Sequence, residues 1–349
     1  GSKLSKREST MKTRTFNIVI GLVTFAFWAA PVGAQSTYEL PRLPDGKPDL
    51  QGVWDFRTLT PLERPEDLAD VAFLSDEATA QLEFEAAART EELNAPSDIR
   101  TEPLPVGGDV GAYNNFWVDQ GARVVDDKRT SLITDPLNGR MPALQPGVKT
   151  DVLSLGEDLP GTRPVRVRAA GIGTDSYEDR GLAERCILGF NSGPPIVPVG
   201  YNQNIQLFQT SSFVVIFNEM VHDARIIPLD GRDHLPETVR QWMGDSRGYW
   251  EGDTLVVETT NFTEKTASFN SSVATSVGNG TTLHLTERFR RTSDDTLLYE
   301  FTINDSTTFT RPFTAALPMK RGEAVFEYAC HEGNYGLFNM LAGARAEEQ

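Results

Sequence analysis

Cysteine and histidine are scarce in this sequence: its 349 residues include two cysteines and four histidines. Two cysteines are too few for a zinc ribbon or for a disulfide-dense scaffold. Basic residues are also in the minority, with 33 Lys plus Arg against 49 Asp plus Glu and a net charge of −16. A protein that binds a nucleic-acid backbone needs a basic face, which this balance does not favour. We therefore expect no nucleic-acid partner.

Several signature motifs are absent as well. The sequence has no G-x-x-x-x-G-K-[ST] phosphate loop, no G-x-G-x-x-G dinucleotide loop and no C-x-x-C-H haem site. Residues 244–248 match a serine-nucleophile motif by their letters, but a match this short gives Ser246 little support. At 39% hydrophobic and 9% aromatic residues, the chain is too apolar to be disordered as a whole. The sequence predicts a folded protein without a bound organic cofactor.

The N-terminus has the pattern of a secretory signal. Residues 1–10 precede Met11 and are not expected to belong to the folded protein. A basic stretch after Met11 leads into an apolar run over residues 16–30, and small residues follow up to Ala34. The run has 15 residues, whereas a membrane span needs ~20, so a cleaved signal peptide is favoured over an anchor. We expect a secreted or periplasmic protein that begins after Ala34.

The mature chain is expected to be strongly acidic and to lack a membrane span. No later segment reaches the ~18 apolar residues of a membrane helix. Residues 1–34 carry five basic residues and one acidic residue, so their removal leaves a charge of −20. Such a charge repels anionic polymers and membrane surfaces. The expected partner is a small-molecule ligand or substrate, and the oligomeric state is left open.

The two cysteines have two possible states in an exported protein. An oxidising compartment allows Cys186 and Cys330 to pair, which would close a span of 144 residues. Such a bridge could stabilise the fold by roughly 4–5 kcal/mol. Two separate buried thiols are an equal alternative.

Alternating apolar and polar residues predict a mainly β protein. One helix is predicted for residues 75–94, with Ser75 as its N-cap and Pro96 after its end. The predicted strands are short, follow one another and are joined by turns; they cover residues 50–57, 113–118, 129–134, 139–141, 204–209, 212–218, 225–229, 248–250, 255–260, 281–291, 297–303, 309–313 and 324–329. Consecutive strands favour an antiparallel meander that closes into a lipocalin-like β-barrel.

The chain is expected to form a single domain after its leader and signal peptide (residues 1–34). Residues 35–200 are predicted to be an irregular N-terminal wrap with short strands and the one helix. Residues 201–349 are predicted to form the barrel core, because the alternation is clearest there.

Seven segments resemble a large group of exported bacterial proteins that are usually described as hypothetical. The resemblance spans most of the mature chain and implies a periplasmic or secreted β protein, without implying an activity. The likeness to lipocalin-type barrels is looser and architectural, so it does not determine function. The segments that carry the resemblance are Leu43–Trp54, Tyr201–Asn204, Glu219–Arg225, Asp230–Arg232, Trp242–Gly248, Trp250–Val257 and Tyr328–Tyr335.

The densest cluster of chemically active side chains is Glu219, His222, Asp223 and Arg225. A histidine ordinarily titrates near pH ~6.5, which suits a general base, and His222 is the candidate here. Glu219 or Asp223 could orient it or act as the partner acid. Arg225 could bind a carboxylate or a developing oxyanion. The alternative is a structural network in which Arg225 pairs with Asp223.

The other three histidines give weaker signals. His331 follows Cys330, so a disulfide would hold it rigidly as a catalytic residue beside the binding candidate Glu332, although it could also be a structural clamp. His222, His234 and His331 could bind a divalent metal, but their spacing does not support it. His284 alternates with leucines and is interpreted as a wall or surface residue.

Two further segments carry binding-type groups. Tyr201 and Asn204 offer a phenol and an amide beside the first clear strand. Trp242 could stack on a ligand ring, although a place in the core is the more frequent role of tryptophan.

Three functions are compatible with these residues. The first is an exported small-molecule enzyme (a lyase, hydrolase or isomerase) with acid–base residues at one end of the barrel. The second is a lipocalin-like binding protein without catalysis, and the third is a structural component of the cell envelope.

The signal peptide gives a direct prediction. Protein produced with residues 11–349 in a secreting bacterium should lose its first residues and begin at Gln35, because cleavage is expected after Ala34. Mass spectrometry of the intact exported protein measures this. A mature form that still contains residues 16–30 would contradict the prediction and favour an anchor.

Overall fold

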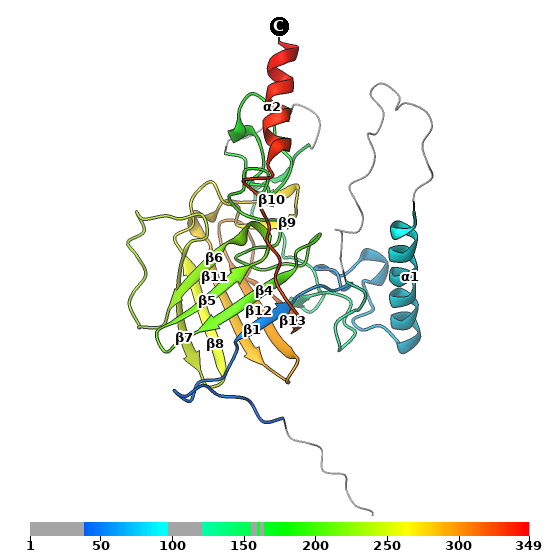
Figure 1. Ribbon diagram of the computed structural model, residues 1–349, viewed down its shortest axis with the longest axis vertical. Helices are drawn as coiled ribbons and strands as arrows, with labels where there is room; N and C mark the ends of the chain where they lie inside the picture. Colours follow the sequence, from blue (N-terminus) through cyan, green and yellow to red (C-terminus); the bar gives the residue numbers. More distant parts are fainter. Residues whose placement is uncertain (1–37, 97–120, 155–158, 161–163, 349) are drawn as a thin grey trace, which may run out of the picture. The chain divides into compact units, whose positions relative to one another are not determined.

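The structure is a computed structural model that describes residues 38–96, 121–154, 159–160 and 164–348. The expected signal peptide, its cleavage site near Ala34 and the expected strand 113–118 lie outside these residues. From Tyr38 onward the chain packs as one unit. The protein is mainly β, as the alternation predicts, and its largest element is an antiparallel barrel-like sheet (Figure 1).

The barrel sheet has the strand order β6-β5-β4-β1-β13-β12-β11-β8-β7, and β2 pairs with β13 off this path. The meander is confirmed in two runs, β4-β5-β6 and β11-β12-β13. Strand β1, from the N-terminal wrap, lies between β4 and β13 and joins these two runs. The strands are β1 (Gly52–Asp55), β2 (Ile133–Asp135), β4 (Asn204–Gln209), β5 (Phe213–Asn218), β6 (Ala224–Pro228), β7 (Asp245–Glu251), β8 (Thr254–Thr260), β11 (His284–Arg291), β12 (Thr296–Asn304) and β13 (Phe313–Arg321).

The two edge strands β6 and β7 approach each other, so that the sheet nearly closes on itself. Gly248 of β7 packs against Ile227 of β6: a Cβ added there would lie 2.9 Å from the Ile227 Cγ2 atom. That distance is shorter than a real side chain tolerates, so glycine at this position permits the close approach. Near closure covers the edges that an open sheet would expose.

The interior of the barrel is filled by large aromatic side chains. Trp54, Phe289, Tyr299 and Phe313 are fully buried and belong to one continuous hydrophobic cluster. Their positions follow the period-2 alternation of the strands, in which every second residue faces inward. The core therefore lies inside the barrel, and the loops at its ends are left to form sites.

Strand alternation also places one ion pair inside this core. Arg225 of β6 and Glu287 of β11 are 6% and 0% exposed, and Arg225 Nη2 donates to Glu287 Oε1 at 2.9 Å. The Tyr299 hydroxyl donates to the same carboxylate oxygen at 2.8 Å and accepts from the Ile196 backbone N–H at 3.0 Å. A buried carboxylate needs such partners, because burial without them is very costly.

The remaining elements lie outside the barrel sheet. A small sheet has the order β3-β10-β9. Ser75 caps helix α1 as predicted, accepting from the Ala78 N–H at 3.2 Å. None of the helices among the described residues has the length and hydrophobicity to cross a membrane. The elements are β3 (Thr150–Val152), β9 (Phe269–Ser272), β10 (Thr275–Val277), α1 (Asp76–Asn94), α2 (Tyr335–Glu347) and the 3₁₀ turns η1 (Glu66–Leu68), η3 (Tyr177–Asp179), η4 (Met220–His222) and η5 (Gly280–Thr282).

Three expected strands are not strands in the structure. Residues 139–141 form a bend that follows a turn, and residues 324–329 follow β13 as an irregular segment. Of residues 309–313, only Phe313 belongs to a strand, because β13 continues instead to Arg321. Pro318 and the adjacent alanines Ala315 and Ala316 weaken the alternation of β13, which explains why the pattern misses it.

The buried ion pair predicts an asymmetric response to mutation. Arg225→Met should lower the free energy of unfolding by about 3–5 kcal/mol, because it leaves the Glu287 carboxylate buried without its counter-ion. Changing both residues (Arg225→Met with Glu287→Leu) should lower the free energy of unfolding by less than the sum of the two single changes. Denaturant unfolding of residues 35–349 measures all three variants.

The exposed pair Arg42–Asp253, 46% and 48% exposed, provides the matched control. Arg42→Met should cost less than about 1 kcal/mol, because solvent screens this pair. Equal losses for Arg225→Met and Arg42→Met would contradict the structural role of the buried pair.

Candidate functional site

The turn between β5 and β6 has an unusual backbone. Val221 and His222 are consecutive non-glycine residues with positive φ angles of 61° and 47°. This conformation is rare for a β-branched residue and costs on the order of 1–3 kcal/mol per residue. The turn leaves the His222 side chain exposed, with its Nδ1 atom 3.0 Å from the Tyr328 carbonyl oxygen. Strain of this kind concentrates at functional sites.

His222 belongs to a group of five polar residues that we call the histidine cluster: Arg168, Ser192, His222, Asp223 and His331. The ring centroids of the two histidines are 6.2 Å apart. The Ser192 hydroxyl donates to Asp223 Oδ2 at 3.4 Å. The charges of Arg168 and of both histidines act on the Asp223 carboxyl group. The fold thus brings together residues from four separate parts of the chain.

Burial dominates the electrostatics of this cluster. It raises the pKa of Asp223 to about 6, although Arg168, the Ser192 hydroxyl and the two histidines favour the ionised carboxylate. Burial also lowers the pKa of Arg168 to about 10, which still leaves the guanidinium charged at neutral pH. Asp223 can therefore gain or lose a proton in the range where general acids and bases work.

A disulfide holds the His331 side of the cluster. Cys186 and Cys330 are bonded to each other, so the pairing alternative is confirmed. Asn334 adds a hydrogen bond of 2.8 Å from its side-chain Nδ2 to the Glu184 carbonyl oxygen. His331 lies between these two attachments in the sequence, and its position is thereby constrained.

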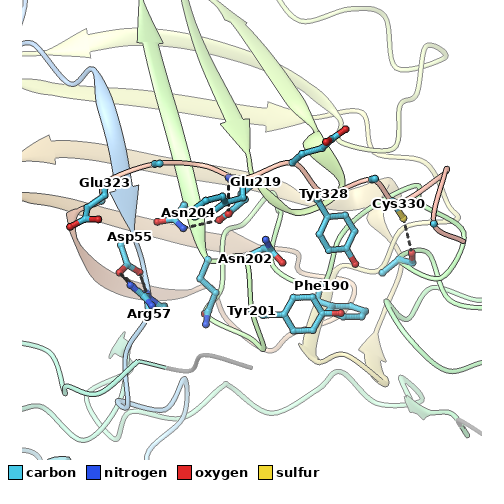
Figure 2. Close-up of a pocket in the computed structure, with 18 of the residues that line it drawn as sticks. Asp55, Arg57, Phe190, Tyr201, Asn202, Asn204, Glu219, Glu323, Tyr328 and Cys330 are labelled. Carbon is cyan, nitrogen blue, oxygen red and sulfur yellow. Dashed lines mark hydrogen bonds and ion pairs between the residues drawn. The ribbon is translucent and has the colours of Figure 1, made fainter. Parts of the chain in front are cut away.

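A cleft of about 890 Å³ lies beside the cluster. Tyr328 and Cys330 line this cleft. The Tyr328 carbonyl contacts His222, and Cys330 directly precedes His331 in the sequence. Figure 2 shows Phe190, Tyr201 and Tyr328 on one side of the cleft. The cleft is lined by Asp55, Arg57, Ala183, Glu184, Phe190, Tyr201, Asn202, Gln203, Asn204, Glu219, Arg321, Gly322, Glu323, Ala324, Phe326, Glu327, Tyr328, Ala329, Cys330, Gly333 and Asn334.

The aromatic side of the cleft is a packed group of rings. The Phe190 and Tyr201 rings meet edge to face at a centroid distance of 5.9 Å. The Tyr201 and Tyr328 rings are nearly parallel, with centroids 6.4 Å apart. Such faces suit a ligand with a ring or another apolar surface.

The polar side of the cleft is held by hydrogen bonds. The Asn204 side chain donates to Glu219 Oε2 at 2.7 Å, and the Phe326 backbone N–H donates to Glu219 Oε1 at 3.0 Å. Glu219 is only 2% exposed. Its interactions bind the segment after β13 to the barrel, which indicates a structural task at the wall of the cleft.

The structure brings six of the nine candidate catalytic and binding residues to one region. Glu219, Tyr201 and Asn204 line the cleft, and His222, Asp223 and His331 belong to the histidine cluster. The other three do not join them. Arg225 lies inside the barrel with Glu287, whereas Trp242 and the exposed Glu332 are not among the residues that line the cleft.

Of the three histidines considered for a metal site, His234 does not join His222 and His331. His234 Nδ1 lies 2.8 Å from Asp245 Oδ2, away from the cluster. In the described part of the chain, no group of three or more His, Cys, Asp or Glu side chains is arranged to hold a metal ion. His284 begins β11 and alternates with the buried Leu285, so it faces away from the interior. The buried Ser246 hydroxyl is paired with Thr259, which leaves the serine-nucleophile motif unsupported.

Sequence reasoning missed two members of the cluster, Arg168 and Ser192. Both lie in a region without periodicity, where the pattern offers no secondary structure. Arg168 is 6% exposed, and its Nη1 atom has no hydrogen-bond partner. The apolar neighbours Val167 and Ala169 indicate that Arg168 lies in a buried segment, but no spacing rule connects it with Asp223.

Comparison with protein-family models, curated proteins and solved structures finds no match to this chain. The resemblance to exported bacterial proteins and the likeness to lipocalins therefore stay predictions. The interpretation of the site depends on its own geometry.

The electrostatics of the cluster give a measurable prediction. The Asp223 carboxyl carbon should titrate near pH 6 in ¹³C NMR spectra, about two units above an ordinary aspartate. Arg168→Met should raise this midpoint further, because it removes a positive charge that favours the carboxylate. Asp223→Asn, which deletes the signal, assigns it. A midpoint below about pH 4.5 would contradict the burial of this group.

Proposed function

We propose that this protein is an exported enzyme that carries out acid–base catalysis on a small molecule bound in the cleft. The observation that carries the proposal is the convergence of His222, His331 and Asp223 beside that cleft. Three groups that can transfer protons, two from the turn after β5 and one from a distant part of the sequence, exceed what a strand-end turn needs. The reaction class is a lyase, hydrolase or isomerase, because each can proceed without an organic cofactor.

The two histidines are close enough to act on neighbouring atoms of one bound molecule. Their ring centroids are 6.2 Å apart, and both residues are exposed. One imidazole can remove a proton while the other donates one, and each role typically contributes 10²–10⁴-fold to the rate. Asp223 is a third candidate, because its pKa of about 6 allows either role.

The cleft supports a small substrate. Its volume of about 890 Å³ falls within the roughly 300–1,000 Å³ of small-molecule sites. Tyr201 contributes an aromatic face and Asn204 lies on the polar side, so a ligand with both ring and hydroxyl character fits.

Export is part of the same proposal. A disulfide between Cys186 and Cys330 is typical of secreted and periplasmic proteins, because cytosolic thiols are kept reduced. The N-terminal signal pattern points to the same compartment.

A binding protein without catalysis is the second candidate. The aromatic group of Phe190, Tyr201 and Tyr328 favours it, since it would serve recognition equally well. A structural envelope component would need neither the cleft nor the cluster.

A substrate screen with residues 35–349 separates these functions. Pools of small metabolites are incubated with the protein and analysed by mass spectrometry for consumed and newly formed compounds. His222→Ala and His331→Ala should each lower turnover by ~10²-fold or more. His284→Ala is the matched control and should retain turnover, because His284 lies outside the cluster.

Each outcome assigns one function. Compounds that bind and are recovered unchanged from the wild-type protein would favour the binding protein. Turnover that survives the double change His222→Ala/His331→Ala would contradict the acid–base assignment. A parallel screen with a chelator tests the divalent-metal alternative, since turnover that persists there excludes a removable metal.

A further inference from the structure

Arg168 stands out among the buried charges of this protein. The other buried guanidinium described above, Arg225, is matched by a carboxylate at hydrogen-bond distance. Arg168 is 6% exposed, and its Nη1 atom is fully buried without a hydrogen-bond partner. Buried polar groups are nearly always paired, so each exception requires an explanation.

Asp223 does not fully satisfy this arginine. The two side chains act on each other electrostatically, yet Asp223 accepts its hydrogen bond from Ser192. With a pKa of about 6, the Asp223 carboxyl is largely ionised at neutral pH and offsets the guanidinium charge, but it leaves the Nη1 donor without a hydrogen bond. An arginine with spare donor capacity therefore lies inside the histidine cluster.

Arg168 also lies directly behind the wall of the cleft. Its carbonyl oxygen accepts from the Ala183 N–H at 2.8 Å, and Ala183 lines the cleft together with Cys330. The planar guanidinium is the side chain best suited to bind a carboxylate through two hydrogen bonds. Nη1 is shielded from solvent, so a ligand reaches it when a neighbouring side chain shifts.

We propose that Arg168, beside Ser192, Asp223, His222 and His331, binds the carboxylate of a small organic acid, and that the protein's substrates carry this group. The proposal takes the location of the site from the proposed function and adds the chemical class of the substrate. The carboxylate would rest against Arg168, while the rest of the molecule would contact the cleft residues Tyr201 and Tyr328.

The negative charge of the chain limits the number of negative charges that this acid can carry. Glu323 and Glu327 are exposed residues of the cleft, and the mature chain is strongly acidic. A polyanion would be repelled by this surface, whereas a compound with one negative charge places that charge at Arg168 alone. A monocarboxylic acid with hydroxyl groups fits both the cluster and the polar side of the cleft.

An isosteric pair of probes tests the proposal. The dissociation constants of D-glucuronate and its neutral analogue D-glucuronamide are measured by calorimetry on residues 35–349, with inorganic sulfate as the free anion. The acid should bind at least ~10-fold more tightly than the amide, because a charge-assisted bond is stronger than a neutral one. Arg168→Gln should abolish that preference, and Arg168→Lys should retain part of it.

Two further variants make the test specific. Arg166→Gln removes the same charge from the same segment, but the Arg166 side chain bonds the Glu264 carbonyl outside the cluster, so the preference should remain. Asp223→Asn removes the carboxylate that competes for Arg168, so the acid should bind several-fold more tightly at pH 7.5. Thermal unfolding of each variant verifies that it is folded.

The results separate this proposal from the proposed function. Equal affinities for acid and amide, no binding of the acid to the wild-type protein, or an unchanged preference in Arg168→Gln would each overturn the carboxylate site. Tighter binding of sulfate than of glucuronate would also overturn it, because it would indicate a site for inorganic anions. Histidine-dependent turnover of a neutral compound would overturn the carboxylate site while supporting the acid–base enzyme.

Discussion

The disulfide between Cys186 and Cys330 is the constraint on which the site depends. After β13 the chain leaves the barrel, and its return across the cleft is held by single hydrogen bonds such as that from the Phe326 N–H to Glu219. Each such bond contributes on the order of 1 kcal/mol, which is too little to hold an irregular segment in place. The covalent bond removes that freedom, fixes one wall of the cleft and places His331 near His222.

The barrel provides the second fixed part of the site through one short segment. Glu219, His222, Asp223 and Arg225 lie within seven residues, but they serve three different surroundings. The 3₁₀ turn η4 positions His222 and Asp223 in the histidine cluster, whereas Glu219 anchors the wall of the cleft. The alternation of β6 places the Arg225 side chain inside the barrel. Because Arg225 pairs there with Glu287, which also accepts from the Tyr299 hydroxyl, the strand that follows the strained turn is held firmly. A rigid strand next to a strained turn is how a fold keeps an unfavourable backbone in place.

The parts of this protein that follow local rules could be predicted from the sequence. Strands β4 and β5 and helix α1 are recognisable because alternation and capping are properties of neighbouring residues. Candidates His222, Asp223 and His331 could be selected by residue type. Their clustering with Arg168 could not be predicted, because it depends on how an irregular region packs against the turn after β5. Arg225 shows the opposite failure: its neighbours in sequence suggest a site, whereas its place on an alternating strand points it inward.

The histidine cluster combines two features that lower stability, positive φ angles at Val221 and His222 and a buried guanidinium with an orphaned donor. Neither is needed to close the barrel, since the turn between β7 and β8 joins its strands with a glycine, Gly252, at positive φ. A bound carboxylate would satisfy the Arg168 donor, and the strained turn presents His222 beside it. A site that is completed by its ligand would therefore account for the orphaned donor and for the place of His222 beside it.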